Sequence, residues 1–281
     1  MRIDSQISLW KQAPGSARRH PRFPGEDRAF LPEHIEPILA RNRFDGGLLV
    51  STGGEAEEIA QLVVWCETSA LLKGIVLAWN ERAAVAESPA LTAVLRGYWT
   101  LADSTDISDA AAHCGAEGLA LDIVPGVNGL GSAPLAAVAS ANPGTPIVLA
   151  HAGGPPLEQH ALAEWMEGMR TLAKEPNIHV KLSGFWSTAL DAWNVATLQS
   201  LVVFLINEFG ANRLLFGSDW PFCLPAHSWK ECLARFTQSI GARKMDFREL
   251  LLGENAARVY RLPRQEAELL SPEADFLKPN G

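Results

Sequence analysis

The stretch Pro146-Ile147-Val148-Leu149-Ala150-His151 places four consecutive apolar side chains before a histidine. An unbroken apolar run of this length predicts a strand covered on both faces, because a half-exposed strand alternates apolar and polar residues. We interpret the stretch Leu119-Ala120-Leu121-Asp122-Ile123-Val124 in the same way. Strands of this kind are typical of parallel sheets whose faces are covered by helices.

Similar short runs recur along the chain and are separated by longer helical patterns. Eight candidate strands are Ile3–Ser8, Gly47–Ser51, Lys73–Trp79, Arg96–Trp99, Leu119–Val124, Pro146–His151, His179–Leu182 and Arg213–Ser218. Their starts lie about 30 residues apart, which is the length of one βα unit. Helices are predicted at Pro32–Arg43, Glu55–Ala70, Leu157–Lys174 and Val195–Phe209, with an additional C-terminal helix at Glu249–Tyr260. The alternation predicts an α/β fold, a single (β/α)8 TIM-type barrel.

The main alternative fold is a doubly wound nucleotide-binding sheet. That fold requires a Gly-x-Gly-x-x-Gly turn after its first strand, whereas here Ser8 is followed by Leu9-Trp10-Lys11. The closed barrel also suits a chain of 281 residues, since such barrels need about 250. We expect residues 1–262 to form the barrel domain and residues 263–281, which are polar and weakly patterned, to form a C-terminal tail.

Composition restricts the classes of partner. The formal net charge is −8 and no concentrated basic face is evident, which argues against nucleic-acid binding. The chain has no apolar run of about 20 residues and no basic, apolar leader pattern, so neither a membrane span nor a secretory signal is expected. The four cysteines form no Cys-x-x-Cys pair. We expect a cytoplasmic protein with a small-molecule substrate, and a homo-oligomer stays open.

In a barrel the reactive residues lie at the carboxyl ends of the strands. Asp219 ends the eighth candidate strand, and a carboxylate there is costly unless it is paired or functional. We expect Asp219 to act as a general base toward water, with a helix cap or a structural ion pair as the alternative. His151 ends the sixth strand and is expected to ligate metal, donate to a carbonyl or shuttle protons. Its alternative is a core histidine.

Two further residues at strand ends are candidates for substrate binding. Lys181, in the seventh strand, is expected to pair with Asp219 or to hold an anionic group, with a side chain reaching out of the rim as the alternative. Trp220 directly follows Asp219, and packing at the rim is its alternative role.

The loop after the first strand is basic in an otherwise acidic protein. Between positions 11 and 28 it carries Lys11, Arg18, Arg19, His20, Arg22 and Arg28. We expect this loop to lie over the barrel mouth, where Arg19 would help to capture an anionic substrate such as a sugar-acid lactone or a dicarboxylate. The alternative is a solvated loop with ordinary surface charge.

Four segments of the chain carry a family resemblance. They are Pro146-Ile-Val-Leu-Ala-His-Ala-Gly-Gly-Pro155, Asn177-Ile-His-Val-Lys-Leu-Ser-Gly184, Arg213-Leu-Leu-Phe-Gly-Ser-Asp-Trp-Pro221 and Glu254-Asn-Ala-Ala-Arg-Val-Tyr-Arg-Leu262. These segments, in this order along the chain, resemble the amidohydrolase-related family. Within that family they are most similar to the branch of sugar-acid lactonases and pyrone-dicarboxylate lactonase. The resemblance extends from Ile3 to Leu262. It implies a barrel that hydrolyses a cyclic ester, with Asp219 as the water-activating base and His151 in the pocket.

The first strand departs from the family pattern. The family usually opens with Ile-Asp-x-His-x-His, whereas here Gln6 and Ser8 stand at the two histidine positions. Both are poor zinc ligands, and the remaining pair, His151 and Asp219, falls short of the three protein ligands of a usual catalytic zinc. We therefore predict no tightly bound catalytic metal, while a weakly bound divalent metal at His151 and Asp219 stays open. Gln6 or Ser8 would join His151 in donating hydrogen bonds to the oxyanion.

Three functions remain, and we rank lactone hydrolysis first. A degenerate, non-catalytic barrel that binds a small acid or a partner protein is favoured by the presence of Gln6 and Ser8 in place of the histidines. A decarboxylase of the same superfamily ranks third, because such enzymes usually depend on metal.

Overall fold

The computed structural model describes residues 1–12, 28–53, 56–126, 129–156, 159–184, 195–241 and 247–263. Most of the basic loop, including Arg19, and nearly all of the C-terminal tail lie outside the described residues. The expectations for that loop and tail therefore stay predictions.

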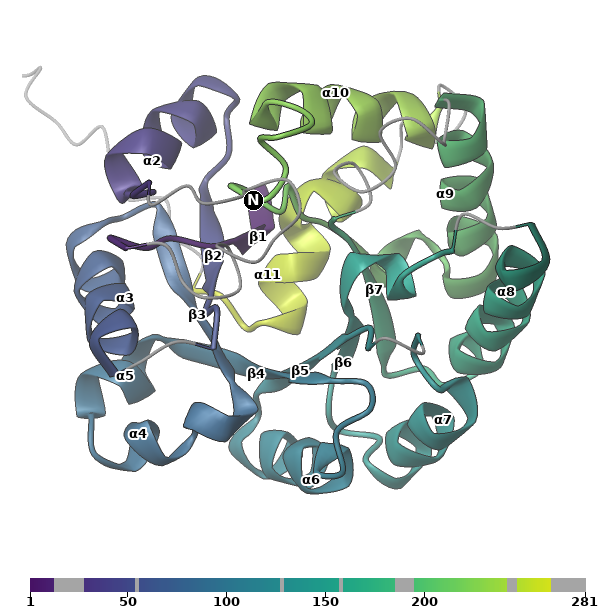
Figure 1. Cartoon of the computed structure of the whole chain (residues 1–281), viewed down its shortest axis with the longest axis horizontal. Helices are drawn as coiled ribbons and strands as arrows, with labels where there is room; N and C mark the ends of the chain where they lie inside the picture. The colour runs from purple at the N-terminus through teal and green to yellow at the C-terminus, as the bar shows by residue number, and fades with distance from the viewer. Residues whose placement is uncertain are drawn as a thin grey trace, which may run out of the picture.

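Eight parallel strands form one sheet in the order of the chain, arranged as a nearly closed barrel (Figure 1). The strands are β1 (Ile3–Ile7), β2 (Gly46–Val50), β3 (Leu72–Ala78), β4 (Leu95–Leu101), β5 (Ala120–Val124), β6 (Ile147–Leu149), β7 (Ile178–Leu182) and β8 (Leu214–Phe216). The predicted (β/α)8 barrel and all eight predicted strands are confirmed.

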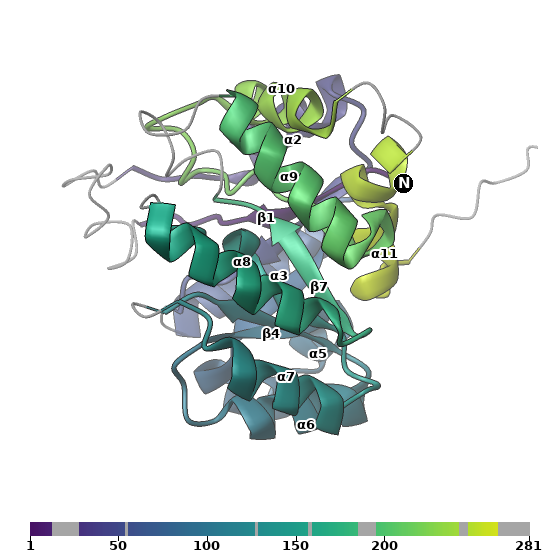
Figure 2. The same ribbon diagram turned by 90° about the vertical axis from the view of Figure 1, so that its right-hand side faces the viewer.

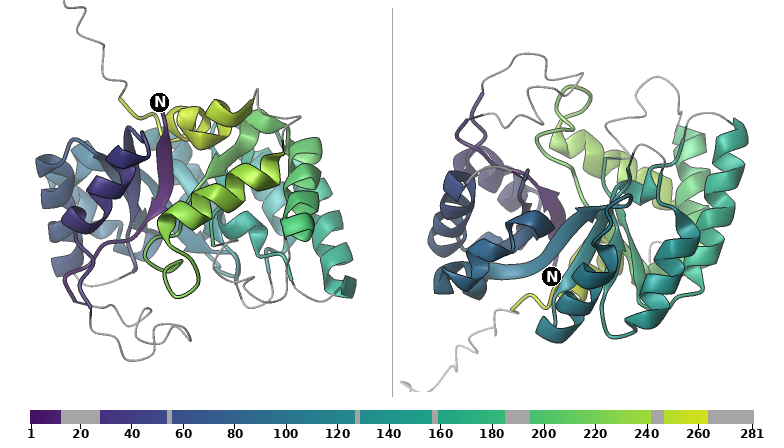
Figure 3. Two further views of the ribbon diagram at one scale, coloured as in Figure 1. Left: turned by 90° about the horizontal axis from the view of Figure 1, so that it is seen from above. Right: turned by 60° about the horizontal axis from the view of Figure 1, so that its bottom comes forward.

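Helices surround the strands (Figure 3). They are α2 (Pro32–Arg41), α3 (Ala56–Thr68), α4 (Ala83–Ala86), α5 (Pro89–Val94), α6 (Ile107–Glu117), α7 (Ser132–Ala141), α8 (Gln159–Ala173), α9 (Val195–Phe209), α10 (Trp229–Ile240) and α11 (Asn255–Val259). Among the described helices, none is both long and apolar enough to cross a membrane.

Polar contacts close the barrel between β1 and the end of β8. Ser5 Oγ donates a hydrogen bond to the Phe216 carbonyl at 2.6 Å, and the Ser8 N–H donates to the Trp220 carbonyl at 2.8 Å. These contacts join the first and last strands near their carboxyl ends. His151 and Asp219, the candidate site residues of the sixth and eighth strands, lie at the same end of the barrel.

The predicted C-terminal helix is divided into a π-helical turn, η5 (Leu250–Glu254), and α11. Gly253 within η5 has non-helical backbone angles, and a Cβ at this position would clash with backbone atoms at the start of β1. The side views place α11 beside the N-terminus (Figure 2).

The buried core inside the barrel joins the strands to α11 and the residues that follow it. Its members include Ile3, Leu48, Val76, Val148, Leu215, Ala256 and Tyr260. The C-terminal segment also contacts the amino ends of β1 and β8, where Gly253 approaches Ile3 and Asn255 Nδ2 donates to the Leu214 carbonyl at 2.8 Å. The carboxyl ends, where barrel enzymes place their chemistry, lie at the opposite end.

Candidate active site

His151 leaves β6 in an unusual backbone conformation. Its φ and ψ are 51° and 39°, and Ala152 also has a positive φ of 53°. Left-handed backbone is uncommon for residues other than glycine and tends to persist at functional sites. The Nδ1 atom of His151 lies 3.2 Å from Ser183 Oγ, and the His151 N–H donates to the same oxygen at 3.3 Å. Ser183, at the end of β7, therefore fixes the imidazole.

Two glycines make room for this arrangement. A Cβ on Gly184, whose φ is +61°, would clash with Nδ1 of the His151 ring. A Cβ on Gly217 would lie 2.8 Å from Cβ of Gln6 and 2.9 Å from Cβ of Ser183. The absence of side chains at these positions allows β1, β6, β7 and β8 to bring their polar residues together.

Asp219 lies just beyond β8 and is tied to β1. Its φ is 62°, and 8% of its surface is exposed. Its N–H donates to the Gln6 carbonyl at 3.1 Å, and its own carbonyl accepts from the Cys223 N–H at 3.0 Å. A backbone hydrogen bond therefore joins the candidate base directly to Gln6.

The two residues at the family's histidine positions differ in their hydrogen bonds. Gln6 Oε1 accepts a hydrogen bond from Lys181 Nζ at 3.0 Å, whereas the Ser8 hydroxyl donates to the Val50 carbonyl at 3.1 Å. A hydroxyl has one proton to donate, so the proton of Ser8 is already engaged. Gln6 is the better hydrogen-bond donor toward a ligand.

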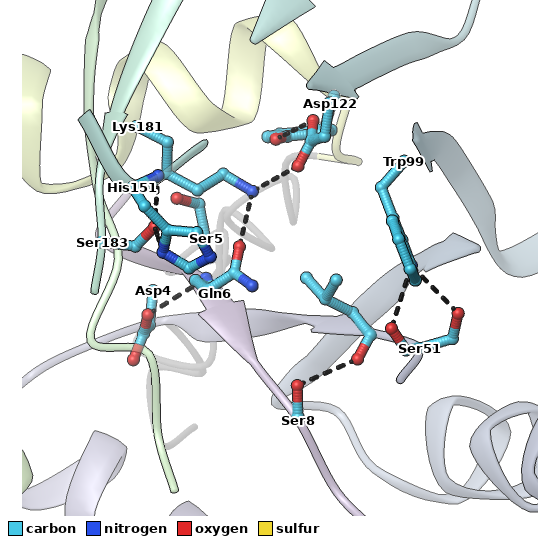
Figure 4. Close-up of polar contacts among 12 residues, drawn as sticks. Asp4, Ser5, Gln6, Ser8, Ser51, Trp99, Asp122, His151, Lys181 and Ser183 are labelled. Carbon is cyan, nitrogen blue, oxygen red and sulfur yellow. Dashed lines mark hydrogen bonds and ion pairs between the residues drawn. The ribbon is translucent and has the colours of Figure 1, made fainter. Parts of the chain in front are cut away.

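Lys181 pairs with Asp122, a partner that we did not predict. Its Nζ lies 2.5 Å from Asp122 Oδ2 (Figure 4). Tyr260 donates to Asp122 Oδ1 at 2.7 Å. Burial, followed by the negative charge of Asp122, raises the pKa of the Tyr260 hydroxyl well above its ordinary value. The sequence carried a signal for this network, because Asp122 is a carboxylate inside an apolar run and such a group needs a partner.

Asp4 holds β1 to the segment before Asp219. Its Oδ1 accepts from the N–H groups of Ser218 at 2.9 Å and Gln6 at 3.2 Å, and its Oδ2 accepts from Trp229 Nε1 at 2.7 Å. Burial raises the pKa of the Asp4 carboxyl to about 6, although these donors oppose the rise.

A second polar group lies at the ends of β2, β3 and β4. Trp99 Nε1 donates to the Ser51 carbonyl at 2.9 Å, and Ser51 Oγ donates to Glu81 Oε2 at 3.0 Å. Burial raises the pKa of the Glu81 carboxyl to about 7. Figure 4 shows Trp99 and Ser51 opposite His151 and Gln6. Our sequence reasoning did not identify these residues.

Trp220 fits the packing alternative. Only 3% of its surface is exposed, and its ring meets Phe30 edge-on at a centroid distance of 5.1 Å. Substrate binding by Trp220 and Arg19 stays a prediction.

The donor set of the described residues does not fit a catalytic zinc. No group of three His, Cys, Asp or Glu side chains suited to a metal ion occurs within the described part of the chain. The side-chain oxygen of Gln6 faces the ammonium group of Lys181, and this positive charge opposes a metal ion beside it.

Comparison with known proteins decides the family. The amidohydrolase family model matches residues 3–262. The chain belongs to that family. Our predicted resemblance is thereby confirmed, and the protein is an amidohydrolase-superfamily enzyme.

Three relatives illustrate the likeness. An L-fucono-1,5-lactonase of Burkholderia ambifaria is 28% identical over 292 residues, covering 95% of this chain and 98% of the relative. A Burkholderia multivorans amidohydrolase crystallised with bound zinc is 26% identical, with a TM-score of 0.80 over 94% of this chain and 100% of its own. A Pseudomonas putida protein assigned as a 2-pyrone-4,6-dicarboxylic acid hydrolase shares the fold, at 22% identity and a TM-score of 0.68 over 92% of this chain and 97% of its own.

Proposed function

We propose that this amidohydrolase opens the lactone ring of a sugar acid, without a tightly bound metal. The observation that carries the proposal is the arrangement of Gln6, His151 and Asp219 at the carboxyl ends of β1, β6 and β8, with the Asp219 backbone bonded to Gln6. Full-length similarity to an L-fucono-1,5-lactonase supports a sugar-acid lactone as the substrate class.

Asp219 is the general base of the proposed reaction. Its carboxylate takes a proton from a water molecule, and the water oxygen forms a bond to the lactone carbonyl carbon. The electron pair of the carbonyl bond moves to the carbonyl oxygen and forms the oxyanion. When the oxyanion collapses, the bond between this carbon and the ring oxygen breaks. The ring oxygen leaves with its electron pair and takes the proton from Asp219, which gives a hydroxy acid.

His151 donates a hydrogen bond to the oxyanion in the proposed reaction. We assign the Ser183 hydroxyl as the donor to Nδ1 of His151, while its oxygen accepts from the His151 N–H. A neutral imidazole that accepts at Nδ1 carries its proton on Nε2. We infer that Nε2–H of His151 points toward the substrate, and the Gln6 amide supplies a second donor.

The proposed chemistry does not need a metal to create its electrophile. A lactone is an activated ester, and two fixed donors stabilise the oxyanion in place of a Lewis acid. Each such donor contributes ~10²–10³ in rate in well-studied enzymes. The ammonium of Lys181, 3.0 Å from Gln6 Oε1, supports this choice over a metal ion at the same place.

The test is a pH-indicator assay of metal-stripped protein against aldonic, aldaric and pyrone lactones, repeated with added zinc or manganese. Acid release that is independent of metal supports the proposal, and the preferred lactone defines the substrate. Activity that appears only with metal would contradict the metal-free mechanism. A lactone that raises the melting temperature but is recovered intact would favour the non-catalytic binding alternative instead.

A further inference from the structure

The ammonium group of Lys181 lies between a carboxylate and an amide inside the barrel. It donates to Asp122 Oδ2 at 2.5 Å and to Gln6 Oε1 at 3.0 Å, so it connects β7 with β5 and β1. Lys181 has no exposed surface, whereas Gln6 keeps 7% of its surface exposed. Of these two residues, Gln6 is therefore the one that can meet a substrate.

The chemistry of an ammonium group fixes the orientation of the amide. An ammonium has three donors and no acceptor, so the atom of Gln6 that faces it must be the carbonyl oxygen. The NH2 group, with its two donors, then lies on the other side. Figure 4 shows the amide nitrogen of Gln6 turned away from Lys181.

Lys181 is itself held in place from two directions. The Tyr260 hydroxyl donates a hydrogen bond of 2.7 Å to the other oxygen of Asp122, Oδ1. The centroid of the Tyr260 ring lies 5.3 Å from Lys181 Nζ. Both Asp122 and Tyr260 are buried. The lysine therefore has little freedom to follow any rotation of the Gln6 amide.

We propose that Lys181 is a positioning residue, which locks the Gln6 amide with its NH2 group toward the reacting carbonyl. This inference rests on the proposed function, in which Gln6 donates to the oxyanion. An amide free to flip would spend part of its time presenting a carbonyl oxygen to the oxyanion, and the two oxygens would repel each other.

The test compares three changes. Gln6→Met removes the amide at similar size. Lys181→Met together with Asp122→Asn removes both charges at once, because either change alone leaves a buried charge without its partner. Thr145→Val is the matched control, since it removes a buried hydrogen bond to the Ala111 carbonyl, at the amino end of β6 and away from the mouth.

The first readout is the side-chain amide resonance pair of Gln6, assigned by its loss in Gln6→Met. We expect two well-separated proton signals in the wild type and in Thr145→Val. In the Lys181→Met/Asp122→Asn variant they should move toward the values of a free glutamine. Unchanged signals in that folded variant would overturn the proposal. This readout needs no activity, so it decides the inference even if the protein does not hydrolyse lactones.

The second readout is kcat against KM. The Lys181→Met/Asp122→Asn variant should lose at least ~10-fold in kcat, with KM within ~3-fold of wild type, because a misplaced donor acts mainly on the transition state. When Gln6→Met is already present, the same two changes should cost no further kcat, because they act through Gln6. Additive losses would show a general structural role and contradict the proposal.

Discussion

Tyr260, the residue that follows α11, donates a hydrogen bond of 2.7 Å to Asp122 Oδ1 in the middle of β5. The contact spans 138 positions of the chain. It connects the C-terminal segment, which closes the amino end of the barrel, to the lysine that bonds Gln6 near the mouth. The last helix is therefore part of the support of the candidate active site.

Tyr260→Phe should destabilise the protein. The substitution leaves one oxygen of a buried carboxylate without its donor, which costs ~1–3 kcal/mol in the free energy of unfolding. Urea unfolding measures this loss. The control is Tyr98→Phe at the other tyrosine, which packs edge-on against Trp79. Equal losses in the two variants would show that the Asp122 contact contributes nothing of its own.

Gly184→Ala should reduce activity by displacing His151. The new Cβ would occupy the space of Nδ1 in the His151 ring, and displacement of the imidazole by about 1 Å costs ~10²-fold in kcat. Gly210→Ala is the control, because Gly210 has a similar positive φ of +77° but lies before β8, at the other end of the barrel. If both variants lost stability equally and neither lost kcat, the packing of His151 against Gly184 would have no catalytic role.

Asp4 should make stability fall as pH rises through the mildly acidic range. Its pKa is raised from 3.8 to about 6 in the folded protein, so between these values the folded state binds more protons than the unfolded state. The contribution of this group is present below the unfolded pKa and is lost as pH rises through the folded pKa. A rise of about two units corresponds to about 3 kcal/mol.

Urea unfolding at about pH 4 and about pH 7 measures this effect, and Asp4→Asn should weaken the pH dependence by that amount. Glu81 titrates with the same sign, since its pKa is raised to about 7, so the difference between wild type and variant isolates Asp4. A variant with the same pH dependence as wild type would show that Asp4 titrates normally.

The strands and their polar ends could be predicted because they depend on local sequence. The apolar run before His151 and the polar residues at the ends of the first, sixth and eighth strands identify both the barrel and the position of its mouth. The partner of Lys181 could not be predicted, because Asp122 lies 59 positions away and the two meet only when the barrel closes. We expected Lys181 to pair with Asp219 or to hold an anionic group, and the structure gives it an ion pair with Asp122, which we did not predict.

The supporting residues were missed for a related reason. Ser183 was not among the predicted site residues, because its contact with His151 depends on the left-handed turn after β6. We treated Asp122 as part of an apolar strand. The cost of burying an unpaired carboxylate was, however, the argument that we used for Asp219. Applied to Asp122, the same argument would have predicted a buried partner.

The most direct test of the account is kcat/KM of metal-stripped wild type and Asp219→Asn on a sugar-acid 1,5-lactone. We predict that the wild type releases acid and that the variant, folded to the same melting temperature, loses ~10²–10⁴-fold, because the amide cannot take the proton from water. An Asp219→Asn protein that kept full lactonase activity would contradict the account.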